Sequence, residues 1–225
     1  MNQNEENQKL IEFWNKYFRD LKPVMFDKST IKVESVFDGF LKYIGDNCVN
    51  VLDIGCGVGS VLMATKILGK KIKNGVGIDT SANAIDFAKN TAELSNISNL
   101  EFINTDDSYL DKLVEYSFDG IICSLDVIPY EKSEKIIKNI TNILPPKGLL
   151  LLKLNFYLTD ELISKIKMNK IDKNTYSFDG ILRAVNLNSD EWISRFKGFK
   201  LLKKDEYQRS PNLPYDRIIL LEKEN

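Results

Sequence analysis

The 225-residue sequence predicts an α/β fold with a central, mostly parallel β-sheet. Two observations lead to this prediction. Between residues 49 and 155, strand-like apolar runs alternate with amphipathic helical stretches, which is the pattern of βαβ units. The run GLLLLKLN (148–155) is apolar almost throughout, as expected of a parallel strand that helices cover on both faces.

The elements follow one another at short intervals. The expected strands are 49–54, 74–79, 100–105, 118–124 and 148–155, and the expected helices are 59–68, 81–95 and 131–143. After these, LTDELISKIKM and SDEWISRF have helical patterns. FKLLKKDEY (199–207) and DRIILLEK (216–223) have strand patterns, and Pro211 and Pro214 mark the loop between them. We expect these last two strands to pair antiparallel.

The N-terminal segment has a different character. Apolar and aromatic residues recur there near helical spacing, namely Leu10, Ile11, Phe13, Trp14, Tyr17, Phe18 and Leu21. Such a stripe packs on the domain or covers a bound ligand as a lid, and the two roles are compatible.

Composition excludes several classes of chemistry. The chain contains no histidine, which rules out Ser-His-Asp and Cys-His mechanisms. Its three cysteines include no C-x-x-C pair, so we expect reduced thiols and no metal site. A net charge of −1 gives no overall basic field for a nucleic acid. With no signal peptide and no membrane-spanning run, we expect a cytoplasmic protein with no membrane contact.

The stretch VLDIGCGVGS (51–60) places three glycines at every second position after a strand, which indicates a tight turn around a ligand. The spacing is G-x-G-x-G, and Ser60 stands where a dinucleotide fingerprint has its last Gly or Ala. Asp53 at the end of the strand suits a cation better than a pyrophosphate. Asp79, at the end of the next strand, could accept hydrogen bonds from ribose hydroxyls. The ligand that needs all three features is S-adenosylmethionine, which has an amine, a sulfonium and a ribose.

Taken together, VLDIGCGVGS, GVGIDTS, NTDD, FDGIICSLDVI and LPPKGLLLLK resemble, in that order, the motifs of class I S-adenosylmethionine-dependent methyltransferases. The resemblance covers residues 45–155 well and the rest more loosely. It implies a seven-stranded sheet of order 3-2-1-4-5-7-6, with strand 7 antiparallel and helices on both faces. We expect one domain: a helical lid segment (1–44), a cofactor-binding core (45–155), and a substrate-side segment with the closing strands (156–225).

The resemblance also implies roles for residues that match the family's motifs. Gly55, Cys56 and Gly57 would border the methionine part of the cofactor. A small residue suits that place, and no second cysteine adjoins Cys56 in the sequence to support a redox role. Asp79 would hold the ribose, with Thr80 beside the adenine. The remaining cofactor contacts would come from Asp106, which would accept from the adenine amino group, from its neighbour Asp107, and from Ser124 near the sulfonium.

The acceptor is predicted from the segment SLDVIPYEK after the fourth strand. This segment lacks the Asn/Asp-Pro-Pro-aromatic box of amino methyltransferases, which places nucleic acid below a small molecule as the acceptor. Because displacement at a sulfonium methyl depends chiefly on alignment, a site without histidine is workable, with Asp126 and Tyr130 as the catalytic candidates. The expected substrate walls are Trp14, Tyr17, Phe18, Asn155, Tyr157 and Arg183.

Three alternatives remain open at this point. KDEYQRSPNLP and SFDGILRAVN resemble protein α-N-terminal methyltransferases, but Tyr130 stands where those enzymes use histidine. A nicotinamide-dependent oxidoreductase would use the same glycine turn, although Asp53 disfavours it. A non-catalytic subunit would bind S-adenosylmethionine without turnover.

Overall fold

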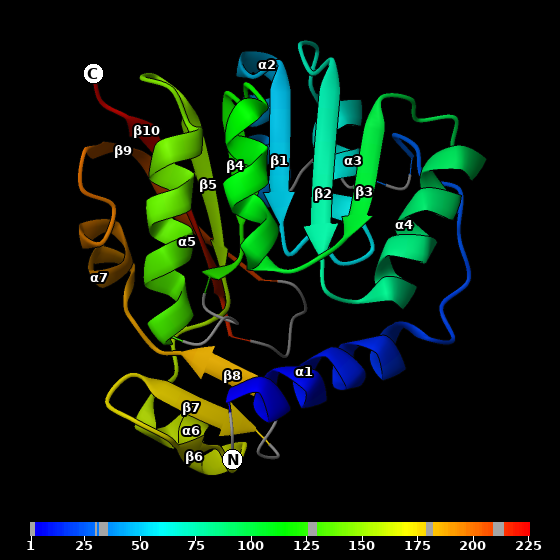
Figure 1. Ribbon diagram of the computed structural model, residues 1–225. Coiled ribbons are helices and arrows are strands. Elements are labelled where there is room, and N and C mark those ends of the chain that lie inside the picture. Colours follow the sequence, from blue (N-terminus) through cyan, green and yellow to red (C-terminus); the bar gives the residue numbers. More distant parts are fainter. Residues whose placement is uncertain (1–2, 30, 32–35, 126–129, 179–181, 209–213) are drawn as a thin grey trace.

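The computed structural model describes residues 3–29, 31, 36–125, 130–178, 182–208 and 214–225. Its centre is a seven-stranded sheet of order β3-β2-β1-β4-β5-β10-β9 (Figure 1). The strands are β1 (Asn50–Ile54), β2 (Asn74–Asp79), β3 (Leu100–Asn104), β4 (Gly120–Cys123), β5 (Leu149–Leu154), β9 (Phe199–Tyr207) and β10 (Asp216–Lys223). Strands β1 to β5 run parallel, whereas β10 pairs antiparallel with both β5 and β9. The predicted fold class, strand order and antiparallel strand are therefore confirmed.

Two hydrophobic cores cover the two faces of this sheet. The helices are α1 (Gln3–Phe18), α2 (Val36–Asn47), α3 (Ser60–Leu68), α4 (Ala82–Leu94), the 3-10 helix η1 (Asp107–Glu115), α5 (Tyr130–Ile143), α6 (Asp160–Lys165) and α7 (Ser189–Ser194). Val51 packs in the core that includes residues of α2, α3 and α4, while its neighbour Leu52 packs with residues of η1, α5 and α7. Because successive strand residues enter opposite cores, the central strands are apolar throughout, as their sequences predict.

A second, three-stranded sheet was not expected from the sequence. It consists of β6 (Asn169–Lys170), β7 (Thr175–Phe178) and β8 (Leu182–Val185), in the order β6-β7-β8. These strands have two to four residues each, too few to give a period-two pattern. In Figure 1 the small sheet lies beyond the carboxyl ends of the parallel strands, on the same side as α1.

Helices α2 and η1 were likewise not predicted. No helix in the described part of the chain combines the length and apolarity needed to cross a membrane.

Candidate functional site

The glycine turn between β1 and α3 has the backbone shape that its sequence predicts. Gly55, Gly57 and Gly59 have φ values of 73°, 52° and 73°, a region that side chains other than glycine rarely enter. The backbone N–H groups of Gly55 and Cys56 both donate to the carbonyl of Ile78, at 2.9 and 3.0 Å, which fixes the turn against β2. A Cβ at Gly55 would meet no atom within 4 Å, so a ligand could approach the backbone there.

Asp79 connects this turn to the start of α4. Its Oδ2 accepts from the Gly57 N–H at 2.8 Å and its Oδ1 accepts from the Ser81 N–H at 2.8 Å. Burial raises the pKa of Asp79, and the hydrogen bonds from Ser81, Gly57 and Thr80 oppose that rise. The carboxyl group is thereby held in one position between the glycine turn and the first residues of α4.

Asp53 is the most unusual charged group of the turn. Its side chain is only 4% exposed, and Oδ2 has no hydrogen-bond partner among the described residues. Burial raises the pKa of Asp53 to about 7; Lys153 opposes this rise and Asp79 adds to it. A buried carboxyl oxygen without a partner is costly, and a bound cation would remove that cost. The group fits the ammonium of S-adenosylmethionine.

Helix α1 lies across the carboxyl ends of the parallel strands (Figure 1). On the α4 side, Asn15 Oδ1 accepts from Ser81 Oγ at 2.9 Å, and the Asn15 carbonyl accepts from Asn83 Nδ2 at 2.8 Å. On the α5 side, Lys132 Nζ donates to Asn7 Oδ1 at 2.7 Å. The helix is therefore anchored on both sides of the edge where the glycine turn lies.

The aromatic side chains near the end of α1 form a connected cluster. Trp14 and Phe18 stack with ring centroids 5.8 Å apart, and Tyr17 meets Phe18 edge-on at 5.0 Å. Phe18 Cζ would lie 3.8 Å from a Cβ at Gly57, so this ring covers the glycine turn. Trp14 and Phe18 are half-buried, whereas Tyr17 is 64% exposed.

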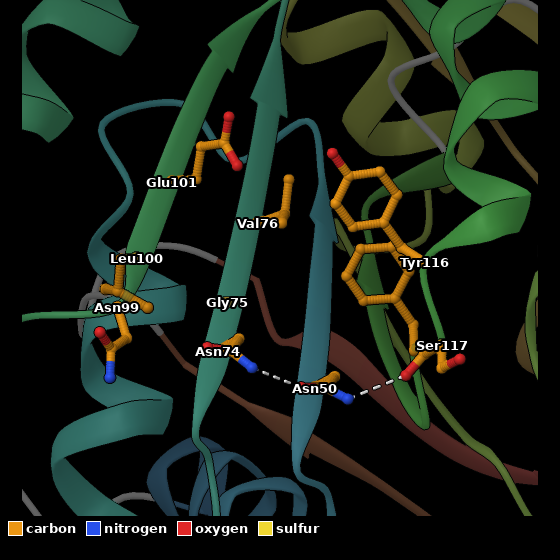
Figure 2. A pocket seen from close by; sticks show the side chains of 10 residues that line it. Asn50, Asn74, Gly75, Val76, Asn99, Leu100, Glu101, Tyr116 and Ser117 are labelled. Carbon is orange, nitrogen blue, oxygen red and sulfur yellow. Dashed lines mark hydrogen bonds between the residues drawn. The ribbon is translucent and has the colours of Figure 1, made fainter.

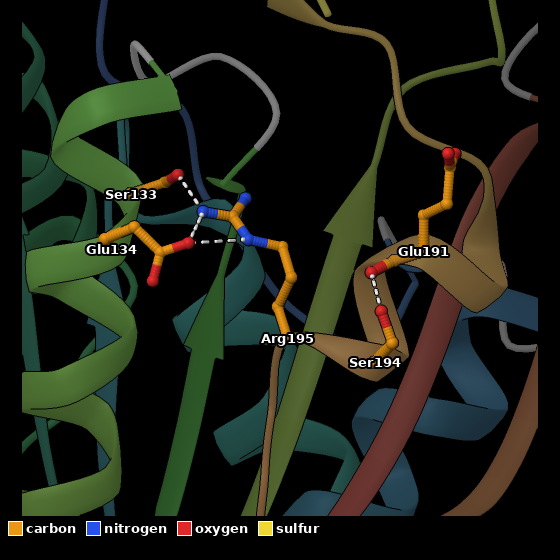
Figure 3. A network of polar contacts seen from close by, with 5 residues as sticks. All are labelled: Ser133, Glu134, Glu191, Ser194 and Arg195. Atoms are coloured by element: carbon orange, nitrogen blue, oxygen red, sulfur yellow. Dashed lines mark hydrogen bonds and ion pairs between the residues drawn. The ribbon is translucent and has the colours of Figure 1, made fainter.

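The first turn of α5, which carries Lys132, is itself held by α7. Arg195 Nη2 donates to Ser133 Oγ and to Glu134 Oε1, both at 2.7 Å (Figure 3). Its guanidinium also lies over the ring of the buried Trp192, at 5.0 Å. These contacts fix the helix that follows the predicted catalytic segment.

The structure describes the side chains of some of the other predicted site residues but not of all of them. Cys56 is buried, and burial raises the pKa of its thiol well above the usual range, which keeps it neutral. Ser124 is half-buried just after β4, and Asp106 is exposed in the turn before η1. Asp126 lies outside the described residues. Asp107 begins η1, Tyr130 begins α5 and Arg183 lies in β8, but the side chains of these three are also outside the description.

Two basic residues at the ends of β5 and β10 were missed by the sequence reasoning. The buried Arg217 donates from Nε and Nη2 to the Asn155 carbonyl, at 3.0 and 2.9 Å, and lies 5.8 Å from the ring centroid of Tyr157. It thus ties two predicted substrate-side residues to β10. Lys153 is half-buried in β5, and a lysine within the apolar run LLLLKL was a signal that could have identified it.

A separate cavity of about 420 Å³ lies at the amino ends of the parallel strands, away from the glycine turn at their carboxyl ends (Figure 2). It is bordered by the starts of β1, β2 and β3 and by Tyr116, Ser117 and Phe118. Asn50 accepts from Asn74 Nδ2 at 2.9 Å and donates to the Ser117 carbonyl at 3.0 Å, which joins these strand ends. The cavity is therefore not part of the site around the glycine turn.

Comparison with known proteins agrees with this geometry. A family model described as a methyltransferase domain, Methyltransf_31, matches residues 46–208. The chain is 28% identical over 193 residues to carboxy-S-adenosyl-L-methionine synthase of Staphylococcus epidermidis, which covers 80% of this chain and 82% of that protein. It is 26% identical over 207 residues to the tRNA N(3)-methylcytidine methyltransferase trm141 of Schizosaccharomyces pombe, with 88% and 82% covered.

Solved structures share the fold at low sequence identity. An S-adenosylmethionine-dependent methyltransferase from Anabaena variabilis superposes with a TM-score of 0.68 at 16% identity, covering 96% of this chain and 94% of that one. The 1,6-didemethyltoxoflavin-N1-methyltransferase of Burkholderia thailandensis, solved with its namesake ligand and S-adenosylhomocysteine, has a TM-score of 0.66 at 12% identity, with 100% and 92% covered.

Proposed function

We propose that this chain, which belongs to the Methyltransf_31 family of methyltransferase domains, methylates a small-molecule acceptor. Membership of the family makes it an S-adenosylmethionine-dependent methyltransferase. The class of acceptor and the roles of individual residues are the proposed parts.

In this proposal the cofactor lies along the glycine turn. Asp79 accepts from the ribose hydroxyls, Asp53 faces the amine, and Gly55 and Gly57 border the methionine chain with Cys56 between them. Thr80, Asp106 and Asp107 surround the adenine, and Ser124 lies near the sulfonium. The unpartnered, buried Oδ2 of Asp53 is the observation that supports this placement best.

When bound, S-adenosylmethionine supplies the methyl group and a sulfide leaving group. The task of the chain is then to hold an acceptor atom in line with that methyl and to exclude water. We assign the acceptor side to the segment after β4, with Asp126 and Tyr130 orienting the acceptor or taking its proton. Trp14, Tyr17, Phe18, Asn155, Tyr157 and Arg183 are the proposed walls.

The anchoring of α1 is the observation that carries the small-molecule proposal. Hydrogen bonds to Asn15 on one side and to Asn7 on the other hold the helix over the strand ends. A small acceptor could be enclosed beneath the helix, whereas a folded tRNA would require it to move. The net charge of −1 also provides no general attraction for a polyanion.

A screen for S-adenosylhomocysteine release tests this proposal. One arm offers small amines, alcohols, thiols and carbon acids; a second offers unfractionated tRNA; a third offers peptides with a free α-amino group. We expect turnover in the first arm only. Turnover confined to tRNA would refute the small-molecule acceptor, and turnover confined to the peptides would favour a protein α-N-terminal methyltransferase. Cofactor binding with no turnover in any arm would favour a non-catalytic subunit.

A further inference from the structure

Lys153 lies on the same face of the sheet as Asp53, at the edge where the cofactor is proposed to bind. Leu149 and Leu151 pack in the core beneath α2 and α3, and Leu150 and Leu152 pack in the other core. By this alternation Lys153 lies on the face covered by α2 and α3. Asp53 lies on the same face, because Val51, two residues before it, packs in that core. Cys123 pairs with Leu152, so Ser124, proposed near the sulfonium, follows beside Lys153.

The two opposite charges on this face are not joined. Lys153 forms no ion pair or hydrogen bond with any residue that the structure describes, although its side chain is half-buried. Asp53 is nine-tenths or more buried, and its Oδ2 has no partner within the same part of the chain. The two groups are near enough for Lys153 to oppose the rise in the pKa of Asp53.

The separation of these charges suits a ligand that carries both signs. Asp53 is level with Leu151 across β4, and Lys153 lies two residues further along β5, which places the two backbones about 12 Å from each other. No ion pair joins the two side chains, so a ligand with charges of both signs could lie between them. An ammonium beside Asp53 would then have its carboxylate beside Lys153, and both charges would be paired.

We propose that Lys153 binds the carboxylate of a ligand whose ammonium faces Asp53, so that the pair recognises an α-amino acid group. This inference rests on the proposed function and deepens it. The amino acid group could be the methionine end of the cofactor or could belong to an amino-acid-like acceptor, and the experiment distinguishes these two sources.

The first measurement is calorimetric titration of wild-type protein, Lys153→Met and Lys153→Arg with S-adenosylhomocysteine and with 5′-methylthioadenosine, which lacks the amino acid end. If the carboxylate is that of the cofactor, Lys153→Met weakens S-adenosylhomocysteine binding by about tenfold or more, as expected for a lost charge-assisted hydrogen bond. Lys153→Arg should keep most of the affinity, and 5′-methylthioadenosine should bind all three proteins equally. Lys138→Met, at an exposed position of α5, is the matched control.

The second measurement compares acceptors found in the screen as free acids and as their methyl esters. If the carboxylate is that of the acceptor, S-adenosylhomocysteine affinity stays at the wild-type level and Lys153→Met removes a preference for the acid of about tenfold or more. The inference is overturned if Lys153→Met folds normally and changes neither the cofactor affinity nor the acid preference by more than about twofold. If Lys153→Met fails to fold, equal results for Lys153→Arg and Lys153→Gln overturn it. Wild-type protein that binds no S-adenosylhomocysteine would instead refute the proposed function itself.

Discussion

Lowering the pH should weaken cofactor binding through Asp53. In the absence of ligand, burial raises the pKa of this carboxyl to about 7, and only its ionised form attracts the ammonium of S-adenosylhomocysteine. If binding lowers that pKa well below 5.5, the apparent Kd rises by a factor of about 1.3 at pH 7.5 and about 33 at pH 5.5 relative to the ionised site. The affinity should therefore fall about 25-fold between these pH values, or about 1.9 kcal/mol.

Calorimetry between pH 5.5 and 8, in two buffers of different ionisation enthalpy, measures this effect. Near pH 6, binding should release close to one proton. The pKa of Asp79 is also raised by burial, so its titration could contribute. 5′-Methylthioadenosine separates the two carboxyl groups, because it has the ribose but not the amine. The reasoning is refuted if S-adenosylhomocysteine affinity does not change with pH, or if 5′-methylthioadenosine and the Asp53→Asn variant show the same pH dependence as wild type with S-adenosylhomocysteine.

Four further outcomes are expected. The folded-state pKa of Asp53 lies above its unfolded value, so its contribution to stability is complete below about pH 4 and is lost as the pH rises through about 7. Asp53→Asn should therefore raise the free energy of unfolding at pH 8 by about 1 kcal/mol or more. A chemical denaturation curve that shows a lower free energy of unfolding would contradict this. Asp79→Ala should weaken cofactor binding by about 1.5–3 kcal/mol with the fold intact; unchanged affinity with a collapsed Tm would make Asp79 structural. Removing residues 1–20 should abolish turnover and leave a folded core by circular dichroism, so full activity would exclude a lid. Asp126→Asn and Tyr130→Phe should each lower kcat/KM for an identified acceptor by about tenfold or more with little change in cofactor affinity; wild-type rates in both would move the acceptor away from β4.

The sequence predicts the large sheet well because its strands are buried on both faces. LLLL at 149–152 in β5 and IILL within β10 are apolar at every position, as expected of strands that are covered on both faces. The glycine turn was predictable because its φ values near +50° to +75° require glycine. The small sheet was not, because strands such as NK and TYSF carry no periodic pattern and depend on tertiary contacts.

In the candidate site, too, some residues could be identified from the sequence and others could not. Asp53 and Asp79 were identified because their positions at strand ends and their charge limit what can bind there. The anchoring of α1 by Asn15 and Asn7 joins residues more than sixty positions apart in the sequence, and no local pattern indicates such contacts. Arg217 was missed for the same reason, since it contacts Asn155 on the neighbouring strand's end, whereas Lys153 had a local signal in its place within an apolar run.

The central claim is that the glycine turn with Asp53 and Asp79 binds S-adenosylmethionine rather than a dinucleotide. Calorimetric titration of the wild-type protein at pH 7.5 with S-adenosylmethionine, S-adenosylhomocysteine and NAD tests it most directly. We predict micromolar binding of the first two ligands, about 7–8 kcal/mol, and no measurable heat with NAD. Binding of NAD with equal affinity would contradict the account.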